Sequence, residues 1–520
     1  MCSVCEQLGM DIHAEAGADG GGGGDPQFAG APSFTVAQAA AYLNRSEASW
    51  EQVDGSPHLG TPTALTYAFR NTDADFRDPA EGAFSRFNAN QISIAQLALQ
   101  SWADVANITF SRRAGEGPSS AYSDNATILF GNSGGGTGAA WGAYAYLPEK
   151  AARGAGSHEG DVFVNSSIGA NTNPHLFEYG MQALVHELGH AIGFDHPGDY
   201  NAGSGGPITY SGDAEFKQDT LQYTVMSYFS ETNTGADYDG WYPSAPQMID
   251  IAAVQRLYGA NMNFHTGDTT YGFNSNASRV WYEAPADHAA IFCAWDAGGT
   301  DTFDFSGYDV RQTIDLRNGF FSSVGGMTFN VSVAAGVKVD GEIVNYIENG
   351  IGGSNKDTVI GNGTDNVLEG RGGGDTLSAG KGDDSLLGGD GDDQLVLGKG
   401  NDVGIGGLGR DIMTGQKGND RFVFQSIDDS MVGLEDRIYG GLDRLDRIDV
   451  SGIDADSSAG GNQAFHLGGA SFDHEAGELI RFYHAGSNTT FVQGDTDGDG
   501  DADFSIAVTG NYASFAGFVL

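Results

Sequence analysis

Three histidines and one glutamate have the spacing of a metal-dependent hydrolytic site. His186 and His190 are four residues apart, so on a helix they lie on one face and can share one ion. Gly193 can end that helix with a positive φ, which returns the chain and makes His196 a third ligand. Imidazole nitrogens suit Zn²⁺, and three protein ligands leave a position open for water, as in catalytic zinc sites. Glu187, beside the ligands, is placed to act as general base.

A second segment, residues 223–228, belongs with this site. Its Met226-Ser227-Tyr228 sequence fits a tight turn that packs beneath a metal. Met226 taken alone is equally well a core methionine. Tyr228 is more informative, because a phenol near Zn²⁺ could bind the ion and then swing away to donate a hydrogen bond to an oxyanion. Without the third histidine, Tyr228 would more often be a core residue.

A repeat indicates a second kind of metal site. Eight nine-residue units run from residue 352 to 423 in the pattern G-G-x-G-x-D-x-U-x, where U is apolar. Glycines permit tight turns that bring carbonyls inward, and carboxylate and carbonyl oxygens suit Ca²⁺. The apolar residue fills the thin core of a parallel β-roll, whose order should depend on the ion. The predicted calcium ligands are Asp357, Asp375, Asp384, Asp393, Asp402, Asp411 and Asp420.

The repeat has an alternative interpretation and some weak units. A flexible Gly/Asp-rich linker is the alternative, and eight units in phase argue against it. Asn355, Thr364 and Gly404 depart from the pattern. The first two units and the sixth are therefore the ones expected to lack a well-formed ion site.

Composition excludes several classes of protein. The chain has 520 residues, and its 25 Lys and Arg against 69 Asp and Glu give a net charge of −44, which disfavours nucleic acid and anionic lipid as partners. Three cysteines exclude a disulfide-stapled scaffold. The sequence has no apolar run long enough to span a membrane. Its first residues also lack the basic residues followed by an apolar stretch that are typical of a Sec signal peptide.

Patterning along the chain predicts the elements that position the site. Residues 35–43 and 94–106 read as helices. Residues 65–69, 127–130, 144–148 and 160–165 read as strands. Beyond residue 260 helical patterns nearly vanish. We therefore expect a flexible leader (1–32), an α+β domain (33–262), an all-β parallel β-roll domain (263–430) and a C-terminal β region (431–520).

These motifs resemble the serralysin-type secreted metalloproteases, which are metzincins with a C-terminal calcium-binding β-roll. The zinc motif, residues 99–110 and the loop at 196–203 carry the resemblance, together with segments 227–234, 250–255 and 257–261. It covers roughly residues 34–430. It implies that His186, His190 and His196 bind zinc, that Glu187 is the base and that Tyr228 is a fifth ligand. It also implies that Tyr144, Ala145, Tyr146 and Leu147 form the edge strand that pairs with the substrate backbone.

The resemblance further implies calcium sites at the domain junction, with ligands from His265, Gly267, Thr269, Asp296, Gly298, Gly299, Asp301 and Glu348. Without it, these Asp- and Gly-rich turns could equally be solvated loops. It implies secretion by a type I exporter that reads the uncleaved C-terminus, and it allows for a small proteinaceous inhibitor. A monomer is expected.

Other segments leave alternatives open. Cys2 and Cys5 could hold a latent enzyme by binding zinc, or could lie in a disordered leader that is removed. Cys293 reads as a core residue. The acidic stretch 495–503 has the alternating carboxylates of a calcium loop, and a solvated turn is the alternative. The apolar end, residues 513–520, fits both an export signal and a last core strand.

Three functions compete. The first is a secreted zinc endopeptidase of broad specificity, stabilised by calcium. The second is a calcium-stabilised extracellular binding or adhesion protein with a vestigial protease domain, against which the intact ligand set and Glu187 argue. The third is a zinc hydrolase that acts on a non-peptide amide. Cleavage preference and the number of calcium ions lie beyond the sequence.

Overall fold

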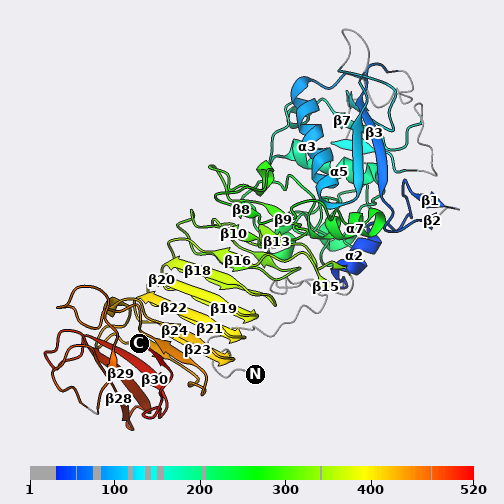
Figure 1. Cartoon of the computed structure of the whole chain (residues 1–520). Coiled ribbons are helices and arrows are strands. Elements are labelled where there is room, and N and C mark those ends of the chain that lie inside the picture. The colour runs from blue at the N-terminus through cyan, green and yellow to red at the C-terminus, as the bar shows by residue number, and fades with distance from the viewer. Residues whose placement is uncertain are drawn as a thin grey trace.

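The computed structural model describes residues 31–53, 56–73, 83–114, 121–134, 142–148, 157–201, 206–339, 342–469 and 471–520. Residues 1–30, which hold most of the predicted leader with Cys2 and Cys5, lie outside the described residues. Figure 1 shows an elongated molecule, with helices and a sheet at one end, a stack of parallel strands in the middle and antiparallel strands at the C-terminal end.

The N-terminal part is built around a five-stranded sheet in the order β4-β3-β5-β7-β6. Four strands are parallel, and β6 runs antiparallel to β7 at the edge. The bounds are β3 (Thr63–Phe69), β4 (Ile108–Arg112), β5 (Ile128–Ser133), β6 (Ala143–Ala145) and β7 (Val162–Asn165). The predicted strands, including the one at the sheet edge, are confirmed.

Helices pack beside this sheet. The long ones are α2 (Val36–Tyr42), α3 (Ala89–Val105), α5 (Tyr179–Ala191) and α7 (Met248–Tyr258); shorter elements are β1 (Gln52–Val53), β2 (Ser56–Pro57), α4 (Gly169–Thr172), α6 (Tyr210–Asp213) and η3 (Glu231–Thr234). Thr35 caps α2, because its side chain accepts the backbone N–H of Gln38. Helix α3 begins at Ala89 rather than at Ile94, because Asn88 and Gln91 cap its first turn reciprocally. Helices α3, α5 and α7 share one core that includes Trp102, Leu188 and Leu257.

The middle of the molecule is a parallel β-roll of two sheets. Their orders are β31-β26-β24-β22-β20-β18-β16-β10-β8 and β11-β17-β19-β21-β23-β25-β30-β29-β28-β27. Neighbouring strands are 18 residues apart, so Leu368 pairs with Leu386 and Leu377 with Leu395. That step is two repeat units, and successive units therefore alternate between the two sheets. Strand β16 (Asn349–Ile351) precedes the repeat, whose strands are β17 (Thr358–Ile360), β18 (Val367–Gly372), β19 (Thr376–Lys381), β20 (Ser385–Asp390), β21 (Gln394–Lys399), β22 (Val403–Leu408), β23 (Ile412–Lys417) and β24 (Arg421–Val423).

The apolar position of each unit forms the core of the roll, as predicted. Leu368, Leu377, Leu386 and Phe422 are completely buried. Gly404 has no side chain to contribute, and a Cβ built there would lie 3.1 Å from a Cδ of Leu397. The Leu397 side chain, which comes from the opposite sheet, thus fills the space that a large residue at position 404 would take.

Short strands join the two parts. They are β8 (Thr270–Gly272), β9 (Phe292–Ala294), β10 (Thr302–Asp304), β11 (Thr313–Asp315), β12 (Phe321–Ser322), β13 (Val331–Val333), β14 (Lys338–Val339) and β15 (Glu342–Ile343), with the 3₁₀ turn η4 (Val280–Tyr282). Cys293 and Trp295 pack into the N-terminal core, which confirms that Cys293 is a core residue. Arg279 and Asp104 pair across the junction through two contacts of 2.6 and 2.8 Å.

The C-terminal region closes the roll. Its elements are η5 (Ile427–Ser430), β25 (Arg437–Ile438), β26 (Arg447–Asp449), β27 (His466–Leu467), β28 (Glu478–His484), β29 (Thr489–Asp495), β30 (Phe504–Thr509) and β31 (Phe518–Val519). Strand β31 pairs with β26, so the apolar end of the chain is the edge strand of one sheet. None of the helices in the described ranges combines the length and apolar character that a bilayer crossing requires. The fold is thus α+β followed by an all-β roll, as predicted.

Candidate metal centre and active site

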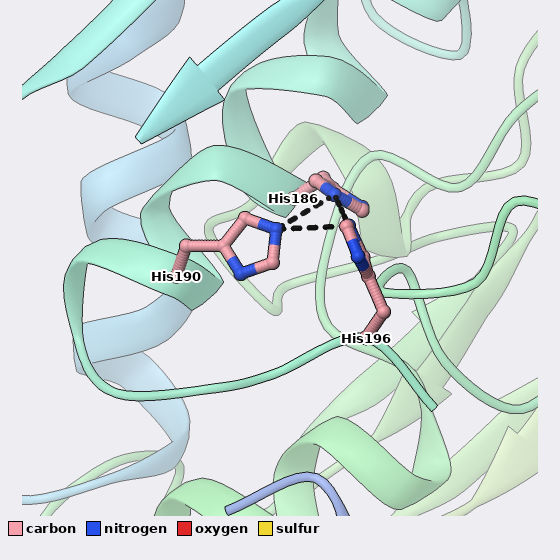
Figure 2. Close-up of side chains that lie close together, drawn as sticks. All are labelled: His186, His190 and His196. Carbon is pink, nitrogen blue, oxygen red and sulfur yellow. Dashed lines mark hydrogen bonds between the residues drawn. The ribbon is translucent and has the colours of Figure 1, made fainter. Parts of the chain in front are cut away.

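Helix α5 and the turn after it bring three histidines together. His186 and His190 lie one turn apart on α5, which ends at Ala191. Gly193 has a φ of 116°, and a Cβ there would meet the Ala48 carbonyl oxygen at 2.5 Å. Glycine therefore allows the chain to turn back at close range and to carry His196 to the face of the helix. Figure 2 shows the three rings pointing toward one another.

The ring nitrogens have the arrangement of ligands to one ion. The Nε2–Nε2 distances are 3.2 Å (His186–His196), 3.1 Å (His186–His190) and 3.0 Å (His190–His196) (Figure 2). Nitrogens bound to one tetrahedral Zn²⁺ at ~2.0–2.1 Å are themselves about 3.3 Å apart. Burial lowers the pKa of all three rings, to about 3 for His186, so they are neutral ligands at physiological pH. These residues fit a zinc ion.

Each imidazole is oriented by a main-chain carbonyl at its other nitrogen. The Nδ1 atoms lie 2.7 Å from the Val225 oxygen (His186), 2.6 Å from the Phe194 oxygen (His190) and 2.8 Å from the Tyr200 oxygen (His196). An N–H donated from Nδ1 leaves the Nε2 lone pair facing the centre, which fixes both tautomer and ring angle.

Glu187 follows His186 directly and lines two cavities beside the histidine cluster. It is 5% exposed, and its Oε2 has no hydrogen-bond partner among the described residues. Burial raises the pKa of this carboxyl well above its usual range, which favours proton uptake. Such a carboxylate has the properties of a general base that later returns its proton.

The predicted turn beneath the metal is present at residues 223–228. Its Val225 carbonyl orients His186, and Met226 is fully buried against α5. A Cβ at Gly189 would lie 2.3 Å from the Met226 Sδ, so Gly189 lets the methionine pack directly under the ligand helix. The Asp250 carboxylate on α7 holds the turn, because it accepts hydrogen bonds from Thr224 Oγ1 (2.5 Å) and Val225 N (2.8 Å).

Tyr228 leaves this turn beside the histidines. Its ring centroid lies 4.5 Å from that of His196 and 5.8 Å from that of His186. The side chain is 41% exposed and borders the cleft. Asp219 ties this segment to the third ligand, because it accepts hydrogen bonds from Ser227 Oγ (2.6 Å) and from the hydroxyl of Tyr200 (2.8 Å).

Two cavities flank the histidine cluster and Glu187. One, of about 440 Å³, is lined by Tyr179, Gln182, Glu231 and Trp241, among others. The other, of about 450 Å³, is lined by Arg45, Tyr144, Ala145 and Leu147, among others. Ala143, Glu187 and Tyr228 line both, so together the cavities form a cleft that passes the metal centre on either side.

The edge strand β6 forms a wall of this cleft. Tyr144 pairs with Phe163 of β7, and Tyr146 extends the pairing through its N–H to the Asp161 oxygen at 3.1 Å. Leu147 lies just beyond the strand. Strand β6 is the last strand in the order of this sheet among the described residues, and the edge of a sheet is where an extended peptide can be added.

The repeat aspartates form two ladders along the roll. The Oδ1 atoms of Asp375, Asp384, Asp393, Asp402, Asp411 and Asp420 each accept the backbone N–H of the residue 18 positions earlier, at 2.6–3.2 Å. The Oδ2 atoms of the first five have no partner among the described residues and are buried. Burial, with neighbouring carboxylates, raises the pKa of Asp393 to about 8. Buried oxygens without donors fit a bound cation. Asp357 begins one ladder and accepts from Gln312 N at 2.7 Å.

Sequence analysis missed two members of these ladders. Asp436 accepts the N–H of Asp411 at 2.8 Å, and Asp446 that of Asp420 at 3.0 Å. They lie 25 and 26 residues after their partners instead of 18, because η5 and the loops near it are inserted. The signal that could have found them is the retained D-x-U pattern, with Ile438 and Ile448 both fully buried.

The junction residues also come together. Asp301 accepts from Thr269 N at 2.8 Å, while Glu348 accepts from Asp301 N at 2.7 Å. The Asp301 Oδ2 is buried and has no hydrogen-bond partner in the described part of the chain, and burial beside Asp296 raises the pKa of Asp301 to about 9.

The remaining predicted residues of the junction contribute backbone or bond elsewhere. Gly298 and Gly299 adopt positive φ angles, and the Gly267 carbonyl accepts from Thr269 Oγ1. The His265 ring is engaged with the Tyr271 hydroxyl and the Ala277 carbonyl, both at 2.8 Å. In the acidic stretch 495–503, carboxylate oxygens of Asp495, Asp497 and Asp499 lie within 4.8 Å of one another.

Comparisons with known proteins agree with this geometry. The family model "Peptidase M10 serralysin C terminal" matches residues 260–520. Metalloprotease AprA of Pseudomonas entomophila is 43% identical over 492 residues, which cover 93% of this chain and 90% of that protein. Metallopeptidase AprA of Pseudomonas marginalis is 42% identical over 94% of this chain and 92% of its own. Serralysin C of Dickeya chrysanthemi is 46% identical over 64% of this chain and 65% of its own.

Among solved structures, the AlgE6R3 subunit of the Azotobacter vinelandii mannuronan C5-epimerase aligns over 32% of this chain and 80% of its own at 26% identity. Its TM-score of 0.22 is too low to indicate a shared fold. The AprA proteins, by contrast, match along nearly the whole of both chains, through the histidine cluster as well as the roll. On that match, the chain belongs to the serralysin family of metalloproteases.

Proposed function

We propose that this metalloendopeptidase is a secreted, zinc-dependent enzyme of broad specificity whose roll is stabilised by calcium. The observation that carries the zinc proposal is the triangle of Nε2 atoms, 3.0–3.2 Å apart, on neutral rings already oriented by carbonyls. His186, His190 and His196 would hold the ion, with Tyr228 as a further ligand. When bound, Zn²⁺ supplies Lewis-acid polarisation of a carbonyl and lowers the pKa of water toward ~7.

The protein's own residues supply the remaining steps. Glu187 accepts the proton of the attacking water and returns it to the departing amine nitrogen, for which its raised pKa is suited. Tyr228 donates a hydrogen bond from its phenol to the oxyanion that forms at the scissile carbonyl. The backbone of Tyr144, Ala145, Tyr146 and Leu147 pairs with an extended peptide. Main-chain bonds carry little side-chain information, so specificity is broad.

Calcium and secretion complete the proposal. The buried Oδ2 atoms of the ladders and of Asp301 support calcium at Asp357, the repeat aspartates and the junction residues. A roll that needs Ca²⁺ for a stable fold at neutral pH stays largely unfolded at the low calcium concentration of the cell interior and folds outside, which suits passage through a type I exporter. Protein and peptide substrates are the partners, with a small proteinaceous inhibitor as a further one.

Metal replacement tests the zinc proposal. The protein is dialysed against a zinc chelator with calcium present, then titrated with Zn²⁺ while bound metal and casein hydrolysis are measured. One equivalent of Zn²⁺ should restore activity, and His190→Ala should bind far less zinc. Full activity without transition metal, or zinc bound equally well by His190→Ala, would contradict the proposal. The adhesion alternative is disfavoured by the metalloprotease relatives over nearly the whole chain.

A further inference from the structure

The cavity lined by Gln182 differs in its charged residues from the cavity on the other side of Glu187. It holds about 440 Å³ and is bounded by α5, the segment after Tyr228 and residues 240–242. Because His186 and Glu187 lie in its wall, a side chain that enters it belongs to a substrate residue beside the cleaved bond. The volume is ample for a long side chain.

Glu231 places a carboxylate in that wall. It begins η3 directly after Ser230 and is 8% exposed. One hydrogen bond reaches its carboxylate, from Ser230 Oγ to Oε2 at 3.2 Å, and Glu231 forms no ion pair among the described residues. With one long hydrogen bond from the described residues, this carboxylate in the cavity wall can accept further hydrogen bonds from a charged donor. A cationic side chain that enters the cavity would supply such a donor.

The rest of the cavity also suits a cation. Besides Tyr228, the aromatic side chains of Tyr179, Trp241 and Tyr242 line it, with the rings of Tyr179 and Tyr242 6.1 Å apart at 75°. Aromatic faces attract guanidinium and ammonium groups. Among its described lining residues there is no lysine or arginine. The cavity on the other side of Glu187 differs, because Arg45 lies in its wall.

We propose that Glu231 is a specificity-determining residue, and that this cavity binds an arginine or lysine side chain of the substrate next to the cleaved bond. The inference rests on the proposed function and narrows it: backbone pairing at β6 tolerates many sequences, while this cavity adds a preference for basic residues. The guanidinium or ammonium forms a charge-assisted bond with Glu231, which is stronger than a neutral hydrogen bond.

The test uses the full-length enzyme loaded with zinc and calcium. Cleavage of a peptide library, with products identified by mass spectrometry, should show enrichment of Arg and Lys at one position flanking the cleaved bond. Matched peptides with arginine or citrulline at that position then compare a charged group with a neutral one of the same shape. We expect kcat/KM to favour arginine by about tenfold or more, as the loss of a charged hydrogen bond predicts.

Two variants test whether Glu231 causes the preference for arginine over citrulline. Glu231→Gln should bring the arginine-to-citrulline ratio near unity, whereas Glu215→Gln, which removes an exposed carboxylate outside the cavity, should leave the ratio unchanged. Equal cleavage of the two peptides by the native enzyme would overturn the role of Glu231 and leave the proposed function standing, even if Glu231→Gln fails to fold. A lack of chelator-sensitive cleavage of any peptide would contradict the proposed function, and this inference with it.

Discussion

At the scale of single residues, main-chain carbonyls set the orientation of the three histidine rings. The three carbonyls that orient the histidines belong to residues 194, 200 and 225, which lie in different turns. The orientation of each ring therefore depends on a different turn of the chain. Such outer partners are worth roughly 10–100-fold in metal affinity in other proteins.

Tyr228 provides the first prediction. Tyr228→Phe removes the phenolic donor while it retains the ring that packs against His196. Loss of one oxyanion donor typically costs about 10²–10³ in kcat, with a small change in KM. Steady-state kinetics on a peptide substrate measures both constants. Tyr439→Phe, at a 37% exposed tyrosine of the roll, is the control. A raised KM with unchanged kcat would indicate a structural role instead.

At the scale of elements, α5, α7 and the turn at 223–228 form one unit. Besides the turn, the Asp250 carboxylate accepts the N–H of Gln247 at 2.8 Å, so α7 is capped by the same group that holds the turn. Burial raises the pKa of Asp250 to about 7 even though these donors favour its charged form. This turn orients His186 through the Val225 carbonyl. It therefore links α7 to the histidine cluster.

A substitution at Gly189 tests whether α5 and the turn at 223–228 are coupled. Gly189→Ala places a methyl group 2.3 Å from the Met226 Sδ in a fully buried site, so the ligand helix and the turn must separate. Overpacking of this kind costs about 1–3 kcal/mol, against a gain of about 1 kcal/mol in helix propensity. Thermal unfolding should shift to lower temperature and zinc affinity should fall. Gly206→Ala, where a Cβ meets nothing within 4 Å, should change neither. Unchanged zinc affinity in Gly189→Ala would argue against the coupling.

The sequence predicted the side chains of the site better than their supports. Histidine spacing, the position of Glu187 and the edge strand all follow from residue type and periodicity. The carbonyls of Val225 and Tyr200 have no sequence signature, because every residue carries one. The role of Asp250 depends on the packing of α7 against a turn some 25 residues away in the chain. Asp436 and Asp446 were not predicted as members of the ladders, because insertions interrupt the nine-residue spacing of the repeat.

At the scale of the whole molecule, the roll stacks buried carboxylates in a chain of net charge −44. Burial and neighbouring carboxylates raise the pKa of Asp384 to about 7, of Asp393 to about 8 and of Asp436 to about 9. Without a cation the folded roll therefore takes up protons that the unfolded chain releases near pH 4. Calcium replaces those protons and favours the ionised carboxylates.

The pH dependence follows from these shifts. A group whose pKa is raised on folding contributes stability below its unfolded pKa, and loses it as pH rises through the folded value. For calcium-free protein, the unfolding temperature of the roll should therefore decrease as the pH is raised from 5 to 8. With saturating calcium this decrease should disappear. Differential scanning calorimetry after removal of calcium measures both. A calcium-free midpoint that rises over this interval would contradict the account of the ladders.

The most direct measurement of the central claim compares native enzyme with Glu187→Gln in casein hydrolysis, with and without a zinc chelator. The variant is isosteric and cannot accept the proton. The account predicts chelator-sensitive cleavage by the native enzyme and a loss of roughly 10²–10⁴-fold in kcat/KM for the variant, at equal zinc content and equal unfolding temperature. Normal cleavage by Glu187→Gln, or cleavage that ignores the chelator, would contradict it.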